Sequence, residues 1–418
     1  MADSKKTVFI FALIIWFLGA FFFFSEYFLR VSPEVMYPEL MLKYTAGAAA
    51  MGALSSFYYY PYILMQIPVG IVTDKFGPRK VMTFAAFLTG LGCILFTFAH
   101  HVEFAVFSRA MMGFCGAFAF VGTLRIAINW FDKKYFALLV GLTQASGMLG
   151  AAFGSAPLSI YVHHVGVDFA MLSFAGLFVG LAIAMAIVVK NAPKNKKAII
   201  SGDLKIWSGI KEVSKSKQLW VNCLFIGFLY GPTTVLAESW GVSFTSALRG
   251  FDATDSAFLV GLIFIGLVVG CPVMGALSSR FGNVPLMRVS AFMCLLLSAL
   301  IIYCPGLSIF TLMFVYFIYG FFNSGIIPSY ARAATLVKRE VSGIALGVTN
   351  MASVLLGAIT IQVIGVLLGT YGHQVNKGVA AIYSGGSYQS IFVIISVSFV
   401  ICFALTFMMS EKKETSRF

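Results

Sequence analysis

Long apolar runs separated by short polar loops dominate this chain. Most runs are about 20 residues long or more, the length that an α-helix needs to cross the roughly 30 Å hydrocarbon core of a bilayer. Twelve runs are predicted, and they begin near Thr7, Gly47, Val81, Phe104, Phe136, Phe169, Leu219, Ala257, Leu286, Ile309, Gly343 and Ser390. The pattern therefore predicts an all-α polytopic membrane protein with twelve transmembrane helices.

A lysine-rich polar loop follows the sixth run. It divides the chain into a first six-helix bundle at 1–189, a cytoplasmic linker at 190–218 and a second six-helix bundle at 219–418. A short internal repeat supports this division, because Gly70-Ile-Val-Thr-Asp-Lys-Phe-Gly77 recurs as Gly275-Ala-Leu-Ser-Ser-Arg-Phe-Gly282. Two parallel six-helix repeats, with a substrate site between them near the membrane midplane, are typical of secondary transporters.

Composition and charge narrow the function further. The chain has 418 residues, of which 60% are hydrophobic and 11% charged, whereas soluble domains are roughly 45–50% apolar and about 25% charged. A soluble enzyme, a secreted disulfide scaffold and a nucleic-acid-binding protein are therefore excluded as main interpretations. Nearly all Lys and Arg residues between the runs fall in alternate loops, on the side that holds both termini. The positive-inside rule then predicts cytoplasmic termini, in the inner (plasma) membrane.

No residue cluster points to a cofactor. The cysteines and histidines lack the spacing of a metal or haem site, no nucleotide-binding P-loop occurs, and no catalytic Ser/His/Asp or Cys/His set lies at membrane depth. We therefore expect no cofactor, no metal and no enzymatic activity. The expected partners are a small-molecule substrate, a coupling proton and membrane lipids, without nucleic acid, and the expected state is a monomer.

The segment Gly70-x-x-x-Asp74-Lys75-x-Gly77-Pro78-Arg79-Lys80 resembles the signature loop of the major facilitator superfamily (MFS). Its degenerate copy at 275–282 stands where that family places a second copy, and Arg109-x-x-x-Gly113-x-x-Gly116 is similar to the pattern of the family's fourth helix. With the twelve predicted spans, the resemblance covers essentially the whole chain. It implies the MFS fold and transport by alternating access.

The resemblance also implies a gate at the signature loop. Asp74 is expected to face the N-terminus of the eleventh helix, near 341–343, and to hold the cytoplasmic side shut until the protein opens inward. The basic residues of the loop could instead serve only to set the topology. The gating residues that this expectation names are Gly70, Asp74, Gly77, Arg79 and Lys80.

Ionisable residues within the spans are the first candidates for the transport site. Each costs roughly 2.5–3.5 kcal/mol on insertion scales, so each needs a partner or a function. Glu26 and Arg30 are four residues apart on the first helix and can neutralise each other. The pair either only makes this helix insertable, or Arg30 binds a substrate anion and Glu26 takes up the coupling proton. Glu238 is the rival proton site, and Arg109 either reaches headgroups or faces the substrate cavity.

The stretch from Glu26 to Met36 resembles the end of the first helix in the organic-anion:cation symporter branch of the MFS. In that branch, an arginine at the position of Arg30 binds the anionic group of the substrate. Two acidic positions differ here: Leu29 replaces the aspartate before this arginine, and Gly116 replaces a carboxylate that is frequent in the fourth helix. Proton coupling is therefore expected to use Glu26 or Glu238.

Polar and aromatic side chains at helical spacing complete the predicted substrate site. Tyr59, Tyr62 and Gln66 share one face of the second helix and line either the cavity or an interfacial tyrosine belt. In the second half of the chain, polar candidates would either bind substrate or support close helix packing. These candidates are Tyr230, Trp240, Asn323, Tyr330, Asn350 and Ser353.

Together these features predict a secondary active transporter for a small anionic or zwitterionic metabolite, such as an organic acid, an amino acid or a short peptide. Alternating access with proton-coupled symport is the expected mechanism. An exporter of an amphipathic compound, such as a drug or siderophore, is an alternative that the Phe-rich spans would suit. A non-transporting sensor with the same fold is another, but the buried charges and the complete signature loop favour transport.

Overall fold

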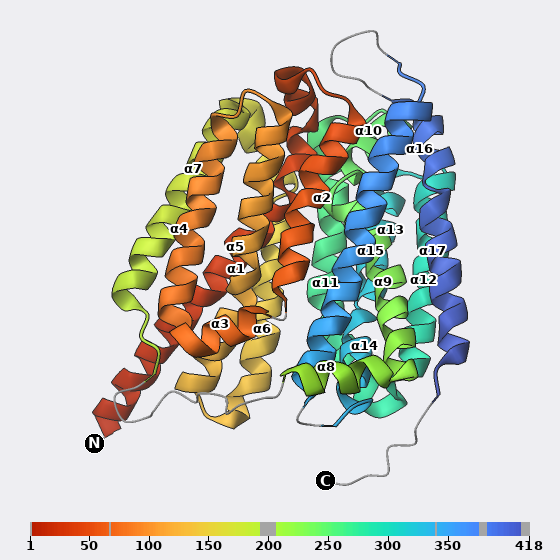
Figure 1. Cartoon of the computed structure of the whole chain (residues 1–418). Coiled ribbons are helices and arrows are strands. Elements are labelled where there is room, and N and C mark those ends of the chain that lie inside the picture. Colours follow the sequence, from red (N-terminus) through yellow and green to blue (C-terminus); the bar gives the residue numbers. More distant parts are fainter. Residues whose placement is uncertain (1, 67, 193–205, 339–340, 376–382, 411–418) are drawn as a thin grey trace.

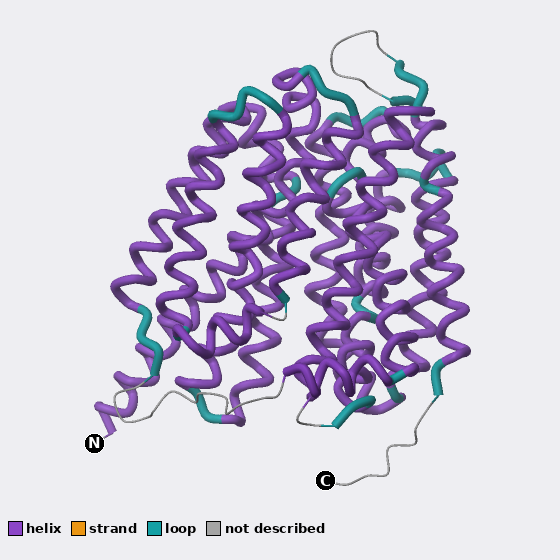
Figure 2. The backbone as a smooth tube through the Cα atoms, viewed as in Figure 1, coloured by secondary structure: helices purple, strands orange, loops and turns teal. Residues whose placement is uncertain are grey.

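Helices account for nearly all of the chain that the computed structural model describes, namely residues 2–66, 68–192, 206–338, 341–375 and 383–410 (Figure 2). Helices suit these apolar segments because each satisfies its backbone hydrogen bonds internally, which the bilayer interior requires. The predicted all-α polytopic fold is therefore confirmed.

The helices form two groups that lie side by side (Figure 1). The first group comprises α1 (Ala2–Tyr44), α2 (Ala48–Met65), α3 (Pro68–Phe76), α4 (Pro78–Thr97), α5 (Val102–Trp130), α6 (Lys133–Phe153) and α7 (Ala156–Val188). The second comprises α8 (Ile206–Lys215), α9 (Lys217–Glu238), α10 (Gly241–Arg249), α11 (Ala253–Phe281), α12 (Asn283–Tyr303), α13 (Ile309–Asn323), α14 (Ile326–Thr335), α15 (Ser342–Tyr371), α16 (Gly385–Ile391) and α17 (Val393–Leu405), with a 3-10 helix at Thr406–Met408. Part of the predicted linker, 193–205, lies outside the described residues.

The helices of the structure do not correspond one to one to the twelve that the sequence predicts, because several membrane crossings are interrupted. Within the described residues, ten helical segments are long and apolar enough to span a membrane. The second crossing is α2 followed by α3. The fifth is α6 continued by the first part of α7, because Gly166, with φ of 78°, turns the chain back inside α7. Glycine adopts this left-handed conformation at little cost, and the rest of α7 is the sixth crossing.

We call the end of the molecule where α1 begins and α17 ends the terminus side, and the opposite end the far side (Figure 1). The two groups meet on the far side. On the far side, α2 packs along α15, and α6 and α7 pack against α11. A Cβ on Gly52 would lie 3.3 Å from the Cα of Gly365, so α2 and α15 are in backbone contact there. Ser56 adds a hydrogen bond of 2.9 Å to Gln362.

The terminus side is different. There α3 packs mainly on α4 and α5, within its own group. A Cβ on Gly343 or Gly347, in the first turns of α15, would meet no atom within 4 Å. The groups are therefore in close contact on the far side and not at the start of α15.

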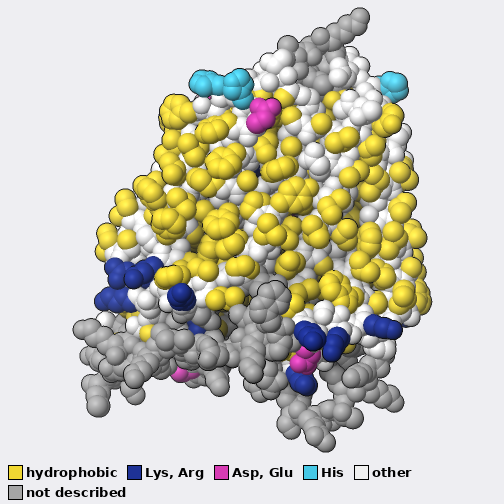
Figure 3. Space-filling model, in the orientation of Figure 1, with side chains coloured by type: hydrophobic (Ala, Val, Ile, Leu, Met, Phe, Trp, Pro, Cys, Tyr) yellow, Lys and Arg dark blue, Asp and Glu magenta, His cyan; other side chains and the backbone are white. Residues whose placement is uncertain are grey.

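The surface has the banding of a protein that crosses a membrane. On the face shown in Figure 3, apolar side chains cover the middle of the molecule. Lys and Arg side chains gather toward the terminus side, and His side chains lie at the far side. This multi-pass arrangement matches the apolar runs of the sequence.

Candidate functional site

A buried ion pair on α1 lies at the centre of the candidate site. Arg30 donates from Nε and Nη2 to Oε1 of Glu26, at 3.0 and 2.6 Å, and the two side chains are only 2% and 1% exposed. The Tyr58 hydroxyl donates to the same oxygen at 2.8 Å. The Arg30 guanidinium carbon lies 4.0 Å from the ring centroid of Tyr27 and 4.6 Å from that of Tyr62. Aromatic rings thus hold this cation away from lipid.

A glycine on α5 makes room for the Glu26 carboxylate. A Cβ on Gly116 would lie 2.6 Å from the Tyr58 hydroxyl oxygen and 2.9 Å from Cγ of Glu26. The Glu26 side chain therefore fills the space beside the helix position where the symporter branch often carries its own carboxylate. Its second oxygen, Oε2, is buried and has no hydrogen-bond partner within the described parts of the chain.

Arg109 lies behind the ion pair and holds the α1 backbone. It donates from Nη1 to the Leu29 carbonyl at 3.0 Å and from Nη2 to the Arg30 carbonyl at 2.9 Å. The Leu29 carbonyl lacks its usual helical donor because Pro33, four residues later, has no N–H. At 1% exposed, Arg109 is enclosed by protein, and its contacts are those of a residue that positions Arg30.

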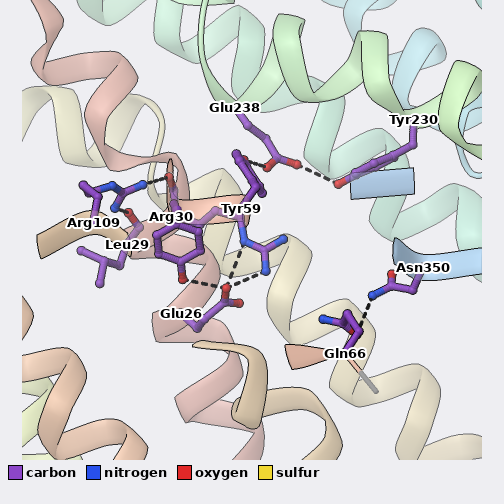
Figure 4. A network of polar contacts seen from close by, with 10 residues as sticks. Glu26, Leu29, Arg30, Tyr59, Gln66, Arg109, Tyr230, Glu238 and Asn350 are labelled. Atoms are coloured by element: carbon purple, nitrogen blue, oxygen red, sulfur yellow. Dashed lines mark hydrogen bonds and ion pairs between the residues drawn. The ribbon is translucent and has the colours of Figure 1, made fainter. Parts of the chain in front are cut away.

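Glu238 joins the two groups of helices. It lies at the end of α9, accepts a hydrogen bond from Tyr230 at 2.8 Å and accepts a second from Tyr59 of α2. Glu238 is buried, and no ion pair to it is found among the described residues. In the view of Figure 4, the Arg30 guanidinium lies between the carboxylates of Glu26 and Glu238.

A second polar bridge, between Gln66 and Asn350, also crosses between the groups (Figure 4). Asn350 of α15 donates to Oε1 of Gln66 at 3.0 Å and accepts from the Tyr330 hydroxyl at 2.7 Å. Ser353 donates to the Asn350 carbonyl at 2.7 Å. The structure therefore brings these four residues, predicted from the two halves of the sequence, into one cluster.

Two other predicted residues lie apart from this cluster. The indole of Trp240 donates to the Ile361 carbonyl at 3.2 Å, at the junction between α9 and α10. Asn323 donates to the Leu229 carbonyl at 2.9 Å, which is a packing contact inside the second group. Within the described structure, neither side chain forms a hydrogen bond with Arg30 or with either carboxylate, so the geometry does not bring them to the site.

Residues that sequence reasoning left out also contribute. Tyr58 completes the shell around Glu26. Glu34, 3% exposed, accepts a hydrogen bond of 2.6 Å from the backbone N–H of Val242 in the other group. Its position, four residues after Arg30 and eight after Glu26, places it on the same face of α1. This helical spacing is the feature of the sequence that could have identified Glu34 as a site candidate.

The signature loop is anchored within its own group. Gly77 has φ of 80°, and a Cβ there would lie 2.5 Å from Nδ2 of Asn191. The backbone N–H of Arg79 donates to Oδ1 of the same asparagine at 3.0 Å, and its side-chain Nε donates to the Ala186 carbonyl at 3.1 Å. Gly70 lies in α3, Lys80 is exposed in α4, and the side chain of Asp74 lies outside the described residues. The predicted latch to α15 thus stays a prediction.

Comparisons with known proteins agree with this architecture. The model of the Major Facilitator Superfamily matches residues 15–361. The chain is 25% identical over 298 residues to the probable sulfoacetate transporter SauU of Cupriavidus necator, covering 68% of this chain and 69% of the relative. It is 25% identical over 361 residues to the probable galactarate/D-glucarate transporter GudP of Escherichia coli, covering 77% and 79%.

A solved structure shares the fold. The bacterial homologue of the human lysosomal transporter Spinster, in its inward-facing and unoccupied conformation, matches with a TM-score of 0.77. The sequences are 13% identical, and the match covers 96% of this chain and 97% of that one.

Proposed function

The chain belongs to the major facilitator superfamily, whose members are transporters and not enzymes, and from this premise we propose that it is a secondary active transporter of small organic anions or zwitterions. It acts as a monomer by alternating access in the inner (plasma) membrane, in symport with protons. The observation that carries the proposal is the buried Glu26–Arg30 pair in a ring of tyrosines.

Arg30 is suited to bind a carboxylate or sulfonate. Its hydrogen bonds to Glu26 use one carboxylate oxygen and two guanidinium nitrogens, so other N–H groups of its planar fork stay available to a ligand. Bidentate binding of planar oxyanions is the typical use of arginine in buried sites. Sulfoacetate, galactarate and D-glucarate, named for the two relatives, are all anions, which supports this class of substrate.

Glu26 supplies a physical link between substrate and proton. When a substrate anion takes over Arg30, the Glu26 carboxylate loses its cation while it stays buried. An unpaired buried charge costs several kcal/mol, so Glu26 takes up a proton instead. Its Oε2, which has no hydrogen-bond partner among the described residues, is the atom available to that proton. Glu238, which accepts from two tyrosines without an ion pair in the described structure, is the second proton-coupling candidate.

The remaining site residues follow from this arrangement. Tyr59, Tyr62 and Tyr230 surround the two carboxylates and Arg30, and the Gln66–Asn350 bridge with Tyr330 and Ser353 crosses the path between the groups. Both sets would contact a substrate that lies between the two halves. Arg109 acts indirectly, by holding the α1 backbone at Arg30.

The basic residues at the terminus side suggest that this side is cytoplasmic. The far-side contacts of α2 with α15 then correspond to an inward-facing arrangement. In the return to the outward-facing state, Asp74 would reach the N-terminus of α15 and the signature loop would close the cytoplasmic side. The rigid bodies that move are the two bundles at 1–189 and 219–418, which the segment 190–218 joins.

Asp74→Asn tests the cytoplasmic latch. The change removes a negative charge worth roughly 0.3–2 kcal/mol beside a helix N-terminus. We expect transport to slow severalfold, and thiol labelling of a cysteine placed at Gly343 to report a more open terminus side. Ser279→Ala, at the equivalent position of the degenerate second loop, is the matched control and should change neither measurement. Unchanged transport and labelling in Asp74→Asn would remove this residue from the gate.

Thermal unfolding of the purified protein tests the substrate class. A ligand that binds only the native state stabilises it by RT ln(1 + [L]/Kd), about 2.7 kcal/mol at 100 Kd. We expect a raised unfolding temperature with sulfonates, sugar acids or amino acids at millimolar concentration, and none with uncharged sugars. Stabilisation by amphipathic drugs alone would favour the exporter alternative over our proposal.

A further inference from the structure

A third buried carboxylate connects the two groups on the far side of the site. Glu34 of α1 accepts a hydrogen bond of 2.6 Å from the Val242 backbone N–H, and the Gly241 N–H faces the same carboxylate. Both N–H groups belong to the first turn of α10, where helical N–H groups lack partners in their own helix. No Lys or Arg forms an ion pair with Glu34 in the described parts of the chain. This carboxylate is therefore held across the group boundary by a helix end.

The helix end exists because the seventh crossing is broken. Ser239 has φ of −149° and ψ of −54°, so α9 ends at Glu238 and α10 starts at Gly241. A Cβ on Gly241 would lie 1.8 Å from the Leu236 carbonyl oxygen, which leaves glycine as the residue that fits this break. The break leaves N–H groups without partners in their own helix and aims them at Glu34.

A neighbouring contact, made by Tyr37, also joins α1 to the break between α9 and α10. The Tyr37 hydroxyl, one turn beyond Glu34 on α1, lies 2.7 Å from the Ser239 hydroxyl oxygen and 2.6 Å from that of Ser55. The Tyr37 ring packs on Trp240, with ring centroids 5.0 Å apart. All of these side chains are buried. Helix α1 is thus joined by buried polar bonds to α2 and to the break between α9 and α10.

We propose that Glu34 is the far-side latch of this transporter: its carboxylate holds the N-terminus of α10 against α1 and must release it before the far side can open. A carboxyl oxygen at a helix N-terminus accepts hydrogen bonds from N–H groups that have no partner in their own helix, and the helix dipole adds to this attraction. When the halves separate, water replaces these bonds, so the latch favours the closed far side without locking it.

The latch is built into the segments that carry the site. Glu34 follows Arg30 by one helical turn, about 6 Å along α1, and Glu238 directly precedes the broken segment that leads to Val242. A shift of α1 or α9 on substrate or proton binding would therefore act directly on the Glu34–Val242 bond. This inference goes beyond the proposed substrate chemistry and uses only the alternating-access part of the proposal.

Labelling of a buried cysteine tests the latch without any substrate. Ser56→Cys places the reporter in the far-side contact between α2 and α15, at a fully buried position, in a background with Cys304→Ser. A membrane-impermeant thiol reagent is then applied from the far side. We expect Glu34→Ala to raise the labelling rate about tenfold, the factor that corresponds to about 1.4 kcal/mol. Glu34→Gln, which keeps one acceptor oxygen and replaces the other with an NH2 group, should give an intermediate rate.

Glu39→Ala is the matched control because it removes an exposed glutamate from the same end of α1, and it should label at the parent rate. Gel filtration establishes that each variant is folded. If Glu34→Ala does not fold, Glu34→Gln carries the test alone. Labelling of a folded Glu34 variant at the parent rate would overturn the latch, whether or not the protein proves to transport anions.

Discussion

Arg30→Lys is expected to abolish substrate binding, even though lysine keeps the positive charge. The guanidinium donates from two nitrogens to Glu26 and lies between the rings of Tyr27 and Tyr62. An ammonium is a point charge on a flexible stem and cannot present two parallel N–H groups to a carboxylate or sulfonate. The two charge-assisted hydrogen bonds of that fork are worth roughly 1.5–3 kcal/mol each, so transport should fall at least about 100-fold.

Two measurements on the same purified variant check this result. The thermal shift produced by an active anion should disappear, and uptake into proteoliposomes should fall to background. Lys43→Ala is the matched control, because it breaks the partly exposed Lys43–Asp168 ion pair at the far end of the same helix. That control should bind and transport normally. Normal uptake by Arg30→Lys would show that Arg30 does not bind the substrate anion.

The sequence predicted the helices well because membrane length and apolarity determine them directly. Crossings that contain breaks were harder. The turn at Gly166 lies between His163-His164 and Asp168, and the sequence separates the fifth and sixth runs there. By contrast, α9 stops at Ser239 within a crossing that the sequence predicts as continuous. The break at Ser239 depends on local backbone conformation between two apolar segments, and the hydropathy pattern does not mark it. The sequence therefore predicts how many crossings there are better than where each is interrupted.

The site shows a similar limit. The Glu26–Arg30 pair was predictable because its partners lie one turn apart on one helix, and the structure pairs them. The roles of Arg109 and Glu34 depend on partners far away in sequence: carbonyls of α1 in one case, and the N-terminus of α10 in the other. Periodicity places a side chain on a face, but it does not say which helix covers that face.

Glu26→Gln and Glu238→Gln should separate the two candidates for the coupling proton. Glutamine resembles a permanently protonated glutamate, so a variant at the true proton site should exchange substrate across the membrane yet fail to concentrate it in response to a pH gradient. We expect this behaviour from Glu26→Gln, because Glu26 is the carboxylate paired with Arg30 and its buried Oε2 has no partner in the part of the chain that the structure describes. Accumulation should fall from many-fold to the equilibrium value of about one, since without a proton nothing drives the anion uphill.

Both variants are compared in the same vesicles, with an imposed pH gradient and with substrate on both sides for the exchange assay. Glu238 accepts hydrogen bonds from Tyr59 and Tyr230, and an amide oxygen can accept them as well, so Glu238→Gln should still accumulate substrate. If Glu238→Gln alone fails to concentrate substrate, the proton site lies at the end of α9 and our assignment is wrong. If both variants concentrate it normally, the protein couples to another ion. Loss of exchange in Glu26→Gln would instead make Glu26 part of the substrate site, because a proton carrier is dispensable when substrate moves in both directions.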